Sequence, residues 1–270
     1  MIGGNTVRAE GGINAAETPQ QKKAGIPDTI DQFYADTMKG GHNLNDPALV
    51  RTLTTHAKDA VAWLVSLGAD LNTVGRAGGA KYPRAHRPTD GSAIGPEVIR
   101  VLWKAAKDRK MDVRTQTRAT EIIMKDGRVA GVKATTKDGK VYTIDAKAVV
   151  LATGGFGANQ DMLVKYQPKL KGYATTNQPG ATGDGIILAE HAGAALVDMK
   201  QIQAHPTAAP DGTLISESVR GDGGILINAE GKRFTNELLT RDVVSAAELK
   251  QPGRFAWVFW DDATRKSAKL

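Results

Sequence analysis

Glycine-rich turns divide this chain into short segments and limit the folds open to it. Two glycine pairs, Gly3-Gly4 and Gly11-Gly12, lie close to the start of the sequence. Glycine allows backbone at positive φ and leaves bare peptide against which a flat or charged ligand can bind. Free chain ends fray, whereas a binding loop needs both flanks held. We therefore expect the chain to be a piece cut from a longer ligand-binding protein.

Length and composition are typical of a globular protein. The chain has 270 residues, of which 41% are hydrophobic and 24% charged, enough for one large domain or two smaller ones. No apolar run approaches the ~20 residues of a membrane span. Cysteine is absent, which excludes disulfides, thiolate metal sites and cysteine nucleophiles within the chain.

The net charge of +7 raises the question of nucleic-acid binding. The basic residues are interleaved with acids, however, and form no run longer than Lys22-Lys23. A nucleic-acid footprint needs clustered positive charge. A general positive field that attracts small anionic substrates fits the charge as well.

Helical segments come first along the chain. Residues 47–68 carry an apolar stripe at helical spacing, with Asp46 as a cap before Pro47 and Gly68 at the end. A second helix is expected from about Pro96. The stripe of the first helix consists of Val50, Leu53, Ala57, Ala60, Val61, Leu64 and Leu67.

From Val113 the apolar period changes to two, which is typical of strands. A buried strand is expected at 146–151, directly before Gly154-Gly155, and a helix at 186–192. The alternation predicts an α/β fold with α and β elements mixed along the chain. No G-x-G-x-x-G turn occurs, so a dinucleotide-binding fold would be incomplete. Hairpin strands are expected at 119–124, 129–135 and 141–144, joined by Asp-Gly turns.

Four groups of segments carry a pattern found in a known protein family. They are Gly3–Thr6 with Gly11–Asn14; Ala152–Gly157; Thr176–Gly185; and His205–Thr207 followed by Ser216–Gly221 and Gly231–Glu237. Together they resemble the soluble fumarate reductase flavoproteins of the flavocytochrome c type, within the larger succinate dehydrogenase and fumarate reductase flavoprotein family. Any single glycine loop is a weak signal, but all four groups occur in the family's order over nearly the whole chain.

The resemblance implies a domain organisation. Residues 1–200 would form a partial FAD-binding Rossmann-like domain, and residues 201–270 would begin a capping domain that binds substrate. In this family, the first strand with its phosphate-binding turn lies upstream of the opening loop. A second substrate histidine and a second arginine lie beyond the last residue. We therefore expect FAD as the cofactor, but expect the chain alone to hold it poorly and to be inactive.

The resemblance places the cofactor against the glycine loops. Without it, a glycine turn with a capping Asn explains the first loop equally well, and Asp184 is explained as a helix cap. The residues expected to bind FAD are Asn5, Thr6, Glu10, Gly11, Gly154, Gly155 and Asp184.

A substrate-binding role is implied for His205. A lone histidine is usually a structural residue, but this one matches the family's substrate-carboxylate histidine. Ser216 matches a hydroxyl near the same carboxylate, and Gly11 and Glu217 also match substrate-binding positions. Branches of the family that act on bulkier acids replace the histidine, so its presence favours a small dicarboxylate.

Three further residues match the family's proton-delivery chain. Arg241 would be the acid, and Glu217 and Arg220 would return its proton from solvent; without the resemblance, they are explained as surface ion pairs. Arginine keeps its proton above pH ~12. Even so, a guanidinium held against a carbanion-like carbon can protonate it while its charge stabilises the neighbouring carboxylate.

The expected function is the reduction of the C=C bond of a small unsaturated dicarboxylate, fumarate to succinate, by an FAD-dependent oxidoreductase. An acrylate-, urocanate- or steroid-like substrate on the same fold remains an alternative, as does a non-catalytic binding module. The expected partners are a dicarboxylate and an electron-donor protein or haem domain, without nucleic acid or a membrane span. The compartment stays open, although the resemblance favours the periplasm over the cytoplasm.

Overall fold

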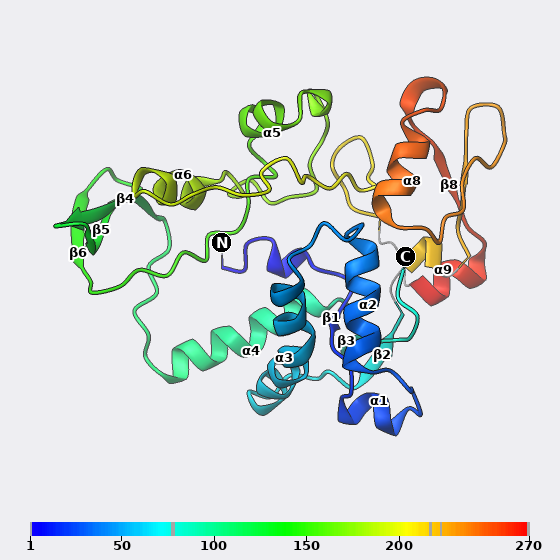
Figure 1. Cartoon of the computed structure of the whole chain (residues 1–270), viewed down its shortest axis with the longest axis horizontal. Coiled ribbons are helices and arrows are strands. Elements are labelled where there is room, and N and C mark those ends of the chain that lie inside the picture. Colours follow the sequence, from blue (N-terminus) through cyan, green and yellow to red (C-terminus); the bar gives the residue numbers. More distant parts are fainter. Residues whose placement is uncertain (1, 77–78, 216–217, 222, 269–270) are drawn as a thin grey trace. The chain divides into compact units, whose positions relative to one another are not determined.

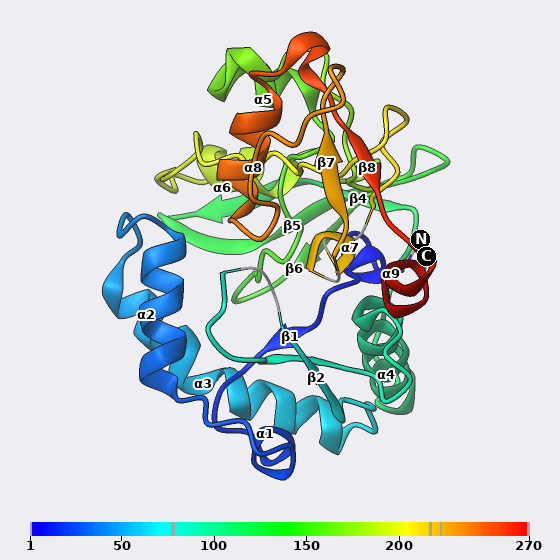
Figure 2. The ribbon, with the colours of Figure 1, turned by 90° about the vertical axis from the view of Figure 1, so that its right-hand side faces the viewer.

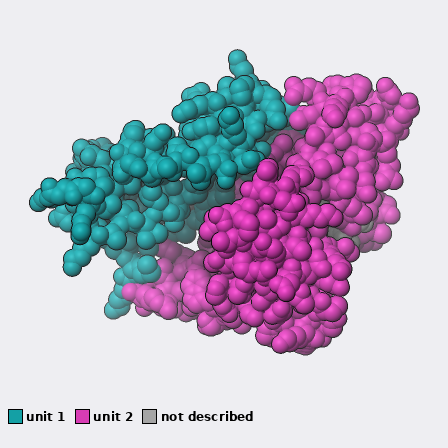
Figure 3. Space-filling model, viewed as in Figure 1, with its two compact units in different colours: residues 1–5, 110–202, 210–212 teal, residues 6–109, 203–209, 213–270 magenta. Residues whose placement is uncertain are grey.

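Figure 1 shows the computed structural model of the chain, which describes residues 2–76, 79–215, 218–221 and 223–268. The described residues form helices and small antiparallel sheets, which confirms the expected mixed fold class. They separate into two compact units, coloured in Figure 3. Unit 1 contains residues 1–5, 110–202 and 210–212, and unit 2 contains residues 6–109, 203–209 and 213–270. The domain division expected at residue 200 stays a prediction.

The hydrophobic core of unit 2 is built largely from helices. Figures 1 and 2 show α2 (Ile30–Gly40) and α3 (Pro47–Ser66) side by side. Helix α4 (Ile94–Asp108) adds two buried residues to the same core, and α1 (Pro19–Lys23) is a short helix near the first strand. The buried core residues are Ala15, Ala16, Phe33, Ala57, Val61, Leu64, Ala69, Leu71, Ile94 and Val101.

The helix predicted at 47–68 is confirmed as α3. The Asp46 carboxylate accepts hydrogen bonds from two backbone N–H groups of the first turn, at 2.8 and 3.1 Å, and therefore caps the helix as expected. Gly68 follows the last turn with a φ of +90°, a conformation that favours glycine. Of the predicted stripe, Leu53 and Ala60 are exceptions, since both are exposed, Leu53 by 57%.

A small antiparallel sheet with strand order β1-β3-β2 lies beside these helices: β1 is Ile13–Asn14, β2 is Thr73–Gly75 and β3 is Ala85–Arg87. His86 of β3 is fully buried, with Nδ1 2.9 Å from the Arg84 carbonyl and Nε2 2.7 Å from the Thr18 hydroxyl. Burial lowers its pKa. His86 is therefore a neutral structural residue that donates through Nδ1.

A buried charge network joins α2 to this sheet. Arg84 is 2% exposed and donates to both carboxylate oxygens of Asp28, at 2.9 and 3.0 Å, and to Asp36 at 2.8 Å. Its guanidinium also lies over the ring of Phe33, 4.8 Å from the centroid. Gln21 donates to the same Asp28 carboxylate at 3.1 Å. The arginine thus satisfies two carboxylates that would otherwise be costly to bury.

The remainder of unit 2 contains short elements. Strands β7 and β8 pair antiparallel and lie side by side in Figure 2. Helix α8 begins at Arg241, one of the predicted site residues. The bounds of these elements are η1 (Thr6–Arg8), α7 (Ser218–Gly221), β7 (Ile225–Ile227), α8 (Arg241–Glu248), η3 (Pro252–Arg254), β8 (Trp257–Phe259) and α9 (Asp262–Ala268).

Unit 1 contains the predicted β-meander. Strands β4 (Thr117–Lys125), β5 (Arg128–Thr136) and β6 (Val141–Asp145) form an antiparallel sheet in that order, which confirms the expected hairpins. Asp126 and Gly127 have φ values of +50° and +73°. Two successive positive φ angles are typical of the tight hairpin turn that Asp-Gly favours.

The strand predicted at 146–151 is wrong, because the structure has no strand between residues 146 and 157. A strand needs a neighbour for its backbone hydrogen bonds, and beyond one bond, from the Ala146 N–H to the Ala130 carbonyl of β5 at 2.9 Å, this segment belongs to none of the described sheets. Val150 is 89% exposed as a result. Helix α6 (Asp184–His191) corresponds to the helix expected at 186–192, and α5 (Gln160–Tyr166) and η2 (Pro168–Leu170) precede it.

Among the described residues, no helix combines the length and the hydrophobicity needed to cross a membrane.

Candidate functional site

In unit 1, Asn5 joins the opening glycine loop to the segment around Asn177. Its Nδ2 donates to Asn177 Oδ1 at 2.5 Å, and its Oδ1 accepts from the backbone N–H of Gln178 at 2.7 Å. The Thr175 hydroxyl accepts from the Asn177 backbone N–H at 3.1 Å and donates to the Gly157 carbonyl at 2.7 Å. The structure therefore brings together three loops that are distant in sequence.

The turn at Gly154 and Gly155 is open to a ligand. Gly154 has a φ of +73°, which favours glycine. No atom lies within 4 Å of the place where a Cβ would stand on either residue. The Gly155 carbonyl accepts from the N–H of Gly183 at 3.2 Å, which ties the turn to the start of α6. Bare peptide in open space fits the close approach of a flat cofactor.

Asp184, in the first turn of α6, is already held by an arginine. Arg118 of β4 donates to both carboxylate oxygens at 2.7 and 3.0 Å, and the Thr182 hydroxyl donates at 2.8 Å. Arg118, more than Thr182, keeps the pKa of Asp184 below its ordinary value. No local sequence pattern predicts this pair, whose members are 66 residues apart. The expected contact between Asp184 and FAD stays a prediction.

In unit 2, the segment from Thr6 to Ala9 rests on the start of α4. The Gly95 N–H donates to the Ala9 carbonyl at 2.8 Å. A Cβ on Gly95 would collide with the Thr6 carbonyl, so only glycine fits here. Gly95 was given no role from the sequence, and the structure assigns it this close packing.

Glu10 and Gly11 follow this segment. Glu10 is partly exposed, and Gly11 is exposed, with no atom within 4 Å of an added Cβ. Gly12 differs, because a Cβ there would lie 2.9 Å from the His86 carbonyl. In the second glycine pair, Gly12 is therefore needed for close packing, whereas the peptide of Gly11 is accessible to a ligand.

The structure brings the segments of His205 and Arg241 together in unit 2. Arg241 opens α8, and its Nη1 donates to Gln203 Oε1 at 2.9 Å. One turn later, the Ser245 hydroxyl donates to the Ala204 carbonyl at 3.1 Å. Two contacts from one helix therefore fix the two residues that precede His205. Gln203 was not predicted as a site residue, although it lies only two positions before His205.

Arg220 lies on α7 and is 6% exposed. Its Nη1 donates to the backbone carbonyl of Glu237 at 2.7 Å. The Glu237 carboxylate accepts from Arg233 Nη2 at 2.6 Å and from the Leu226 N–H at 2.9 Å. Burial alone would raise the pKa of Glu237, but these hydrogen bonds together hold it below the ordinary value. Arg220 is thus a buried, anchored cation and not the surface residue that its spacing also allowed.

Two predicted site residues, Ser216 and Glu217, lie outside the described residues.

Sequence reasoning also missed Glu248, the last residue of α8. Burial raises its pKa to about 7, although the Ala256 N–H and the charge of Arg220 act in the opposite direction. The residue stands seven positions after Arg241, two helical turns further along the same face. The sequence did contain a signal for this residue, because an acid in the last turn of a helix faces the negative end of the helix dipole, which disfavours its charged form.

The raised pKa of Glu248 predicts a loss of stability with rising pH. Below its ordinary value of 4.5 both the folded and unfolded chains hold the proton; between 4.5 and about 7 only the folded chain holds it. The free energy of unfolding should therefore fall through this window, by about 1–2 kcal/mol after allowance for partial exposure. Urea unfolding from pH 5 to 8 should show this fall in the wild-type chain and not in Glu248→Gln.

A second glutamate-to-glutamine substitution tests whether the change in the pH profile belongs to Glu248. The exposed Glu190, in the last turn of α6, offers a matched control. Glu190→Gln should leave the pH profile as in the wild type. A wild-type minus Glu248→Gln difference that stays flat between pH 5 and 8 would contradict the raised pKa.

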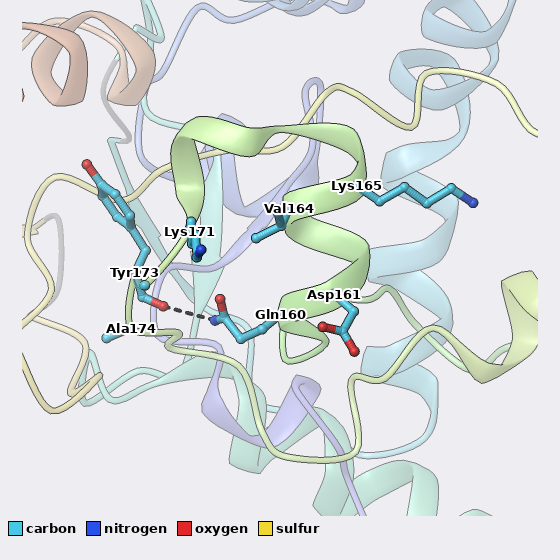
Figure 4. Close-up of a pocket in the computed structure, with 8 residues that line it drawn as sticks. Gln160, Asp161, Val164, Lys165, Lys171, Tyr173 and Ala174 are labelled. Carbon is cyan, nitrogen blue, oxygen red and sulfur yellow. Dashed lines mark hydrogen bonds between the residues drawn. The ribbon is translucent and has the colours of Figure 1, made fainter.

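A pocket beside α5 in unit 1 is shown in Figure 4, where Gln160 Nε2 donates to the Tyr173 carbonyl at 2.9 Å. None of the predicted site residues lines it. Within the described ranges, no group of three or more His, Asp or Glu side chains is placed to hold a metal ion. The residues around the pocket are Gln160, Asp161, Val164, Lys165, Lys171, Gly172, Tyr173 and Ala174.

Comparison with known proteins places this arrangement in a family. The chain belongs to the FAD binding domain family, whose model matches residues 1–256. Membership was expected from the four groups of segments and is confirmed, and the family points to FAD as the cofactor. The open peptides of Gly11, Gly154 and Gly155 fit such a group, because they leave room where a Cβ would stand.

Several individual relatives of the chain are named as reductases. The chain is 51% identical, over 269 residues, to a fumarate reductase (cytochrome) of Shewanella frigidimarina, an alignment covering 99% of this chain and 47% of that protein. It is 34% identical over 270 residues to a urocanate reductase of Eggerthella lenta, covering 97% and 44%. The open conformation of a flavocytochrome c3 fumarate reductase superposes with a TM-score of 0.85 at 45% identity, covering 98% and 48%. The chain thus spans about half the length of these relatives.

Proposed function

We propose that the chain is the central part of an FAD-dependent reductase that converts fumarate to succinate. The observation that carries the proposal is the link between α8 and residues 203–204, which brings the Arg241 and His205 segments together in unit 2. The identity to a fumarate reductase over 269 residues supports the same substrate. Residues 1–200 would belong to the FAD-binding domain and residues 201–270 to the capping domain.

The residues of unit 1 would hold the cofactor. Asn5, Gly154 and Gly155 would contact FAD through side-chain amide and open peptide, with Asp184 at the start of α6 nearby in the same unit. Thr6, Glu10 and Gly11 match further flavin-contact positions of the family. FAD, when bound and reduced, would supply the hydride that one alkene carbon receives.

The residues of unit 2 would bind substrate and supply the proton. His205 would hold one carboxylate, and Ser216 and Gly11 match further substrate-binding positions of the family. Arg241 stabilises the developing negative charge and delivers a proton to the second alkene carbon. Glu217 and Arg220 return a proton to Arg241 from solvent, and the burial of Arg220 supports a cation shielded from bulk water. An electron-donor protein or haem domain would supply the electrons.

A second candidate substrate is urocanate, favoured by the 34% identity to a urocanate reductase. An acrylate- or steroid-like acceptor would need the same acid but a different partner for the rest of the molecule. The presence of His205 favours a second carboxylate over these alternatives. A non-catalytic binding module would need none of the Arg241 contacts.

The experiment is a substrate panel with reduced viologen as electron donor. It uses the chain itself and a chimera in which the chain replaces the aligned half of the Shewanella frigidimarina fumarate reductase. The FAD-loaded chimera should reduce fumarate with a kcat/KM at least about tenfold above that for urocanate or acrylate. Faster turnover of urocanate would favour the second candidate, and bound FAD without any turnover would favour a binding module.

The half taken from the relative could itself favour fumarate, so a variant within this chain is needed. His205→Ala should raise KM for fumarate by about tenfold or more with a smaller fall in kcat, because the residue holds a carboxylate and moves no proton. An equal fall in kcat and no change in KM would exclude that role.

A further inference from the structure

The residue two positions after His205 fixes the orientation of its ring. The backbone N–H of Thr207 donates to His205 Nδ1 at 3.2 Å, and the Thr207 hydroxyl oxygen lies 3.3 Å from the same nitrogen. That hydroxyl donates to the Ile215 carbonyl at 2.9 Å. Since its hydrogen is used there, the hydrogen between Thr207 and the ring comes from the backbone N–H.

The backbone N–H of Thr207 is itself held in place. Thr207 is 1% exposed, and its carbonyl accepts from the Ile215 N–H at 2.9 Å. An antiparallel bridge between Ala208 and Leu214 extends this pairing. Rotating the N–H away from His205 would break these hydrogen bonds in a buried position, which is costly. The donor therefore has one direction.

We propose that Thr207 is a positioning residue that keeps His205 neutral with its hydrogen on Nε2. A ring nitrogen that accepts an N–H carries no hydrogen of its own, so the single hydrogen of a neutral imidazole must lie on the other nitrogen. If Nδ1 were protonated, its hydrogen would point at the hydrogen of the Thr207 backbone N–H, and the hydrogen bond between them would be lost. The bond from Thr207 thus selects one of the three forms that the ring can adopt.

The chemical consequence rests on the proposed function, in which His205 holds a substrate carboxylate. The Nε2–H of the uncharged ring would then donate to the carboxylate. Neutral histidine acts as a hydrogen-bond donor in other preorganised active sites. An imidazolium would lose its charge near pH ~6.5 and weaken its hold above that pH. A neutral donor makes no such change, so substrate affinity should stay constant from pH 6.5 to 8.

The tautomer is measured by ¹⁵N NMR on the 270-residue chain with labelled histidine, assigned with His205→Gln. His205 should show an unprotonated Nδ1 and a protonated Nε2 at pH 7. His86 supplies an internal reference in the same spectrum, because its Nδ1 donates to the Arg84 carbonyl and should be the protonated nitrogen. A protonated Nδ1 on His205 at pH 7, as tautomer or imidazolium, overturns the proposal.

Two variants separate the backbone N–H from the hydroxyl. Thr207→Val keeps the N–H and removes the hydroxyl, so the Nε2–H tautomer should persist. Thr207→Pro removes the N–H, so His205 should become a mixture of tautomers and protonate at higher pH. Persistence of a pure Nε2–H form in a folded Thr207→Pro chain overturns the role of the N–H. If that variant does not fold, the wild-type spectrum still decides.

Turnover in the chimera distinguishes this proposal from the proposed function. Thr207→Pro should raise KM for fumarate by about tenfold with a smaller change in kcat, and the KM of the unaltered protein should stay within about twofold from pH 6.5 to 8. A KM that rises about tenfold across that range overturns the neutral donor. Absence of fumarate turnover in the unaltered chimera overturns the proposed function and leaves the NMR result intact.

Discussion

Replacing Arg84 by methionine is expected to lower the free energy of unfolding by about 3–5 kcal/mol. Methionine keeps most of the side-chain volume but leaves the carboxylate of Asp28, which is fully buried, without its bidentate partner. Asp36 loses a 2.8 Å hydrogen bond at the same time. Urea unfolding followed by far-UV circular dichroism measures the loss.

A surface ion pair between α2 and α3 provides the control. Arg51 of α3 donates to Asp31 of α2 at 2.7 Å, but its side chain is 46% exposed and that of Asp31 is 87% exposed. Arg51→Met should cost less than about 1 kcal/mol. Combining Arg84→Met with Asp28→Asn should recover part of the loss, because no full charge is then left unpaired at that position. An Arg84→Met chain as stable as Arg51→Met would show that the network contributes nothing.

Replacing Arg241 by alanine is expected to abolish fumarate reduction while leaving FAD bound. In the proposed mechanism the guanidinium delivers the proton and stabilises the carboxylate in the transition state, so its loss should lower kcat by about 10³-fold or more. The measurement is fumarate turnover in the FAD-loaded chimera, with flavin absorbance confirming cofactor content. Turnover within about tenfold of the parent, a loss of only ~1.4 kcal/mol, would show that Arg241 is not the acid.

Two further substitutions separate charge from placement at this residue. Arg241→Lys keeps the positive charge but shortens the donor and narrows it to one nitrogen, so substrate binding should survive better than turnover. Gln203→Leu removes the 2.9 Å contact that orients the guanidinium, and should lower kcat less than Arg241→Ala does. If Gln203→Leu raised KM without lowering kcat, the contact between Gln203 and Arg241 would serve substrate binding and not proton delivery.

Local signals account for the parts of the fold that were predicted. The 3.6-residue stripe and the Asp46 cap lie within one segment, and so define α3 without help from elsewhere. Asp126-Gly127 sets its hairpin for the same reason. The strand at 146–151 failed because apolar, β-branched sequence gives strand propensity only, and pairing needs a neighbour that sequence pattern does not identify.

Long-range contacts account for what was missed. Arg84 and Asp28 are 56 residues apart, and Arg118 and Asp184 are 66 apart, so neither pair leaves a pattern in a local window. The candidate site was predicted by resemblance, which supplied residue types in order but not their neighbours. The bond from Thr207 to His205 lies within three residues, yet it depends on a backbone direction set by pairing with Ile215.

The two anchors of α8 have a consequence for engineering the substrate range. Arg241 and Ser245 of α8 hydrogen-bond to Gln203 and Ala204. The same helix therefore positions both His205, which would bind the substrate, and Arg241, which would protonate it. Redesign that shifts the backbone at 203–204 to admit a bulkier acid would also re-aim the guanidinium. Libraries aimed at new acceptors should therefore hold Gln203 and Ser245 constant and vary positions that do not touch α8.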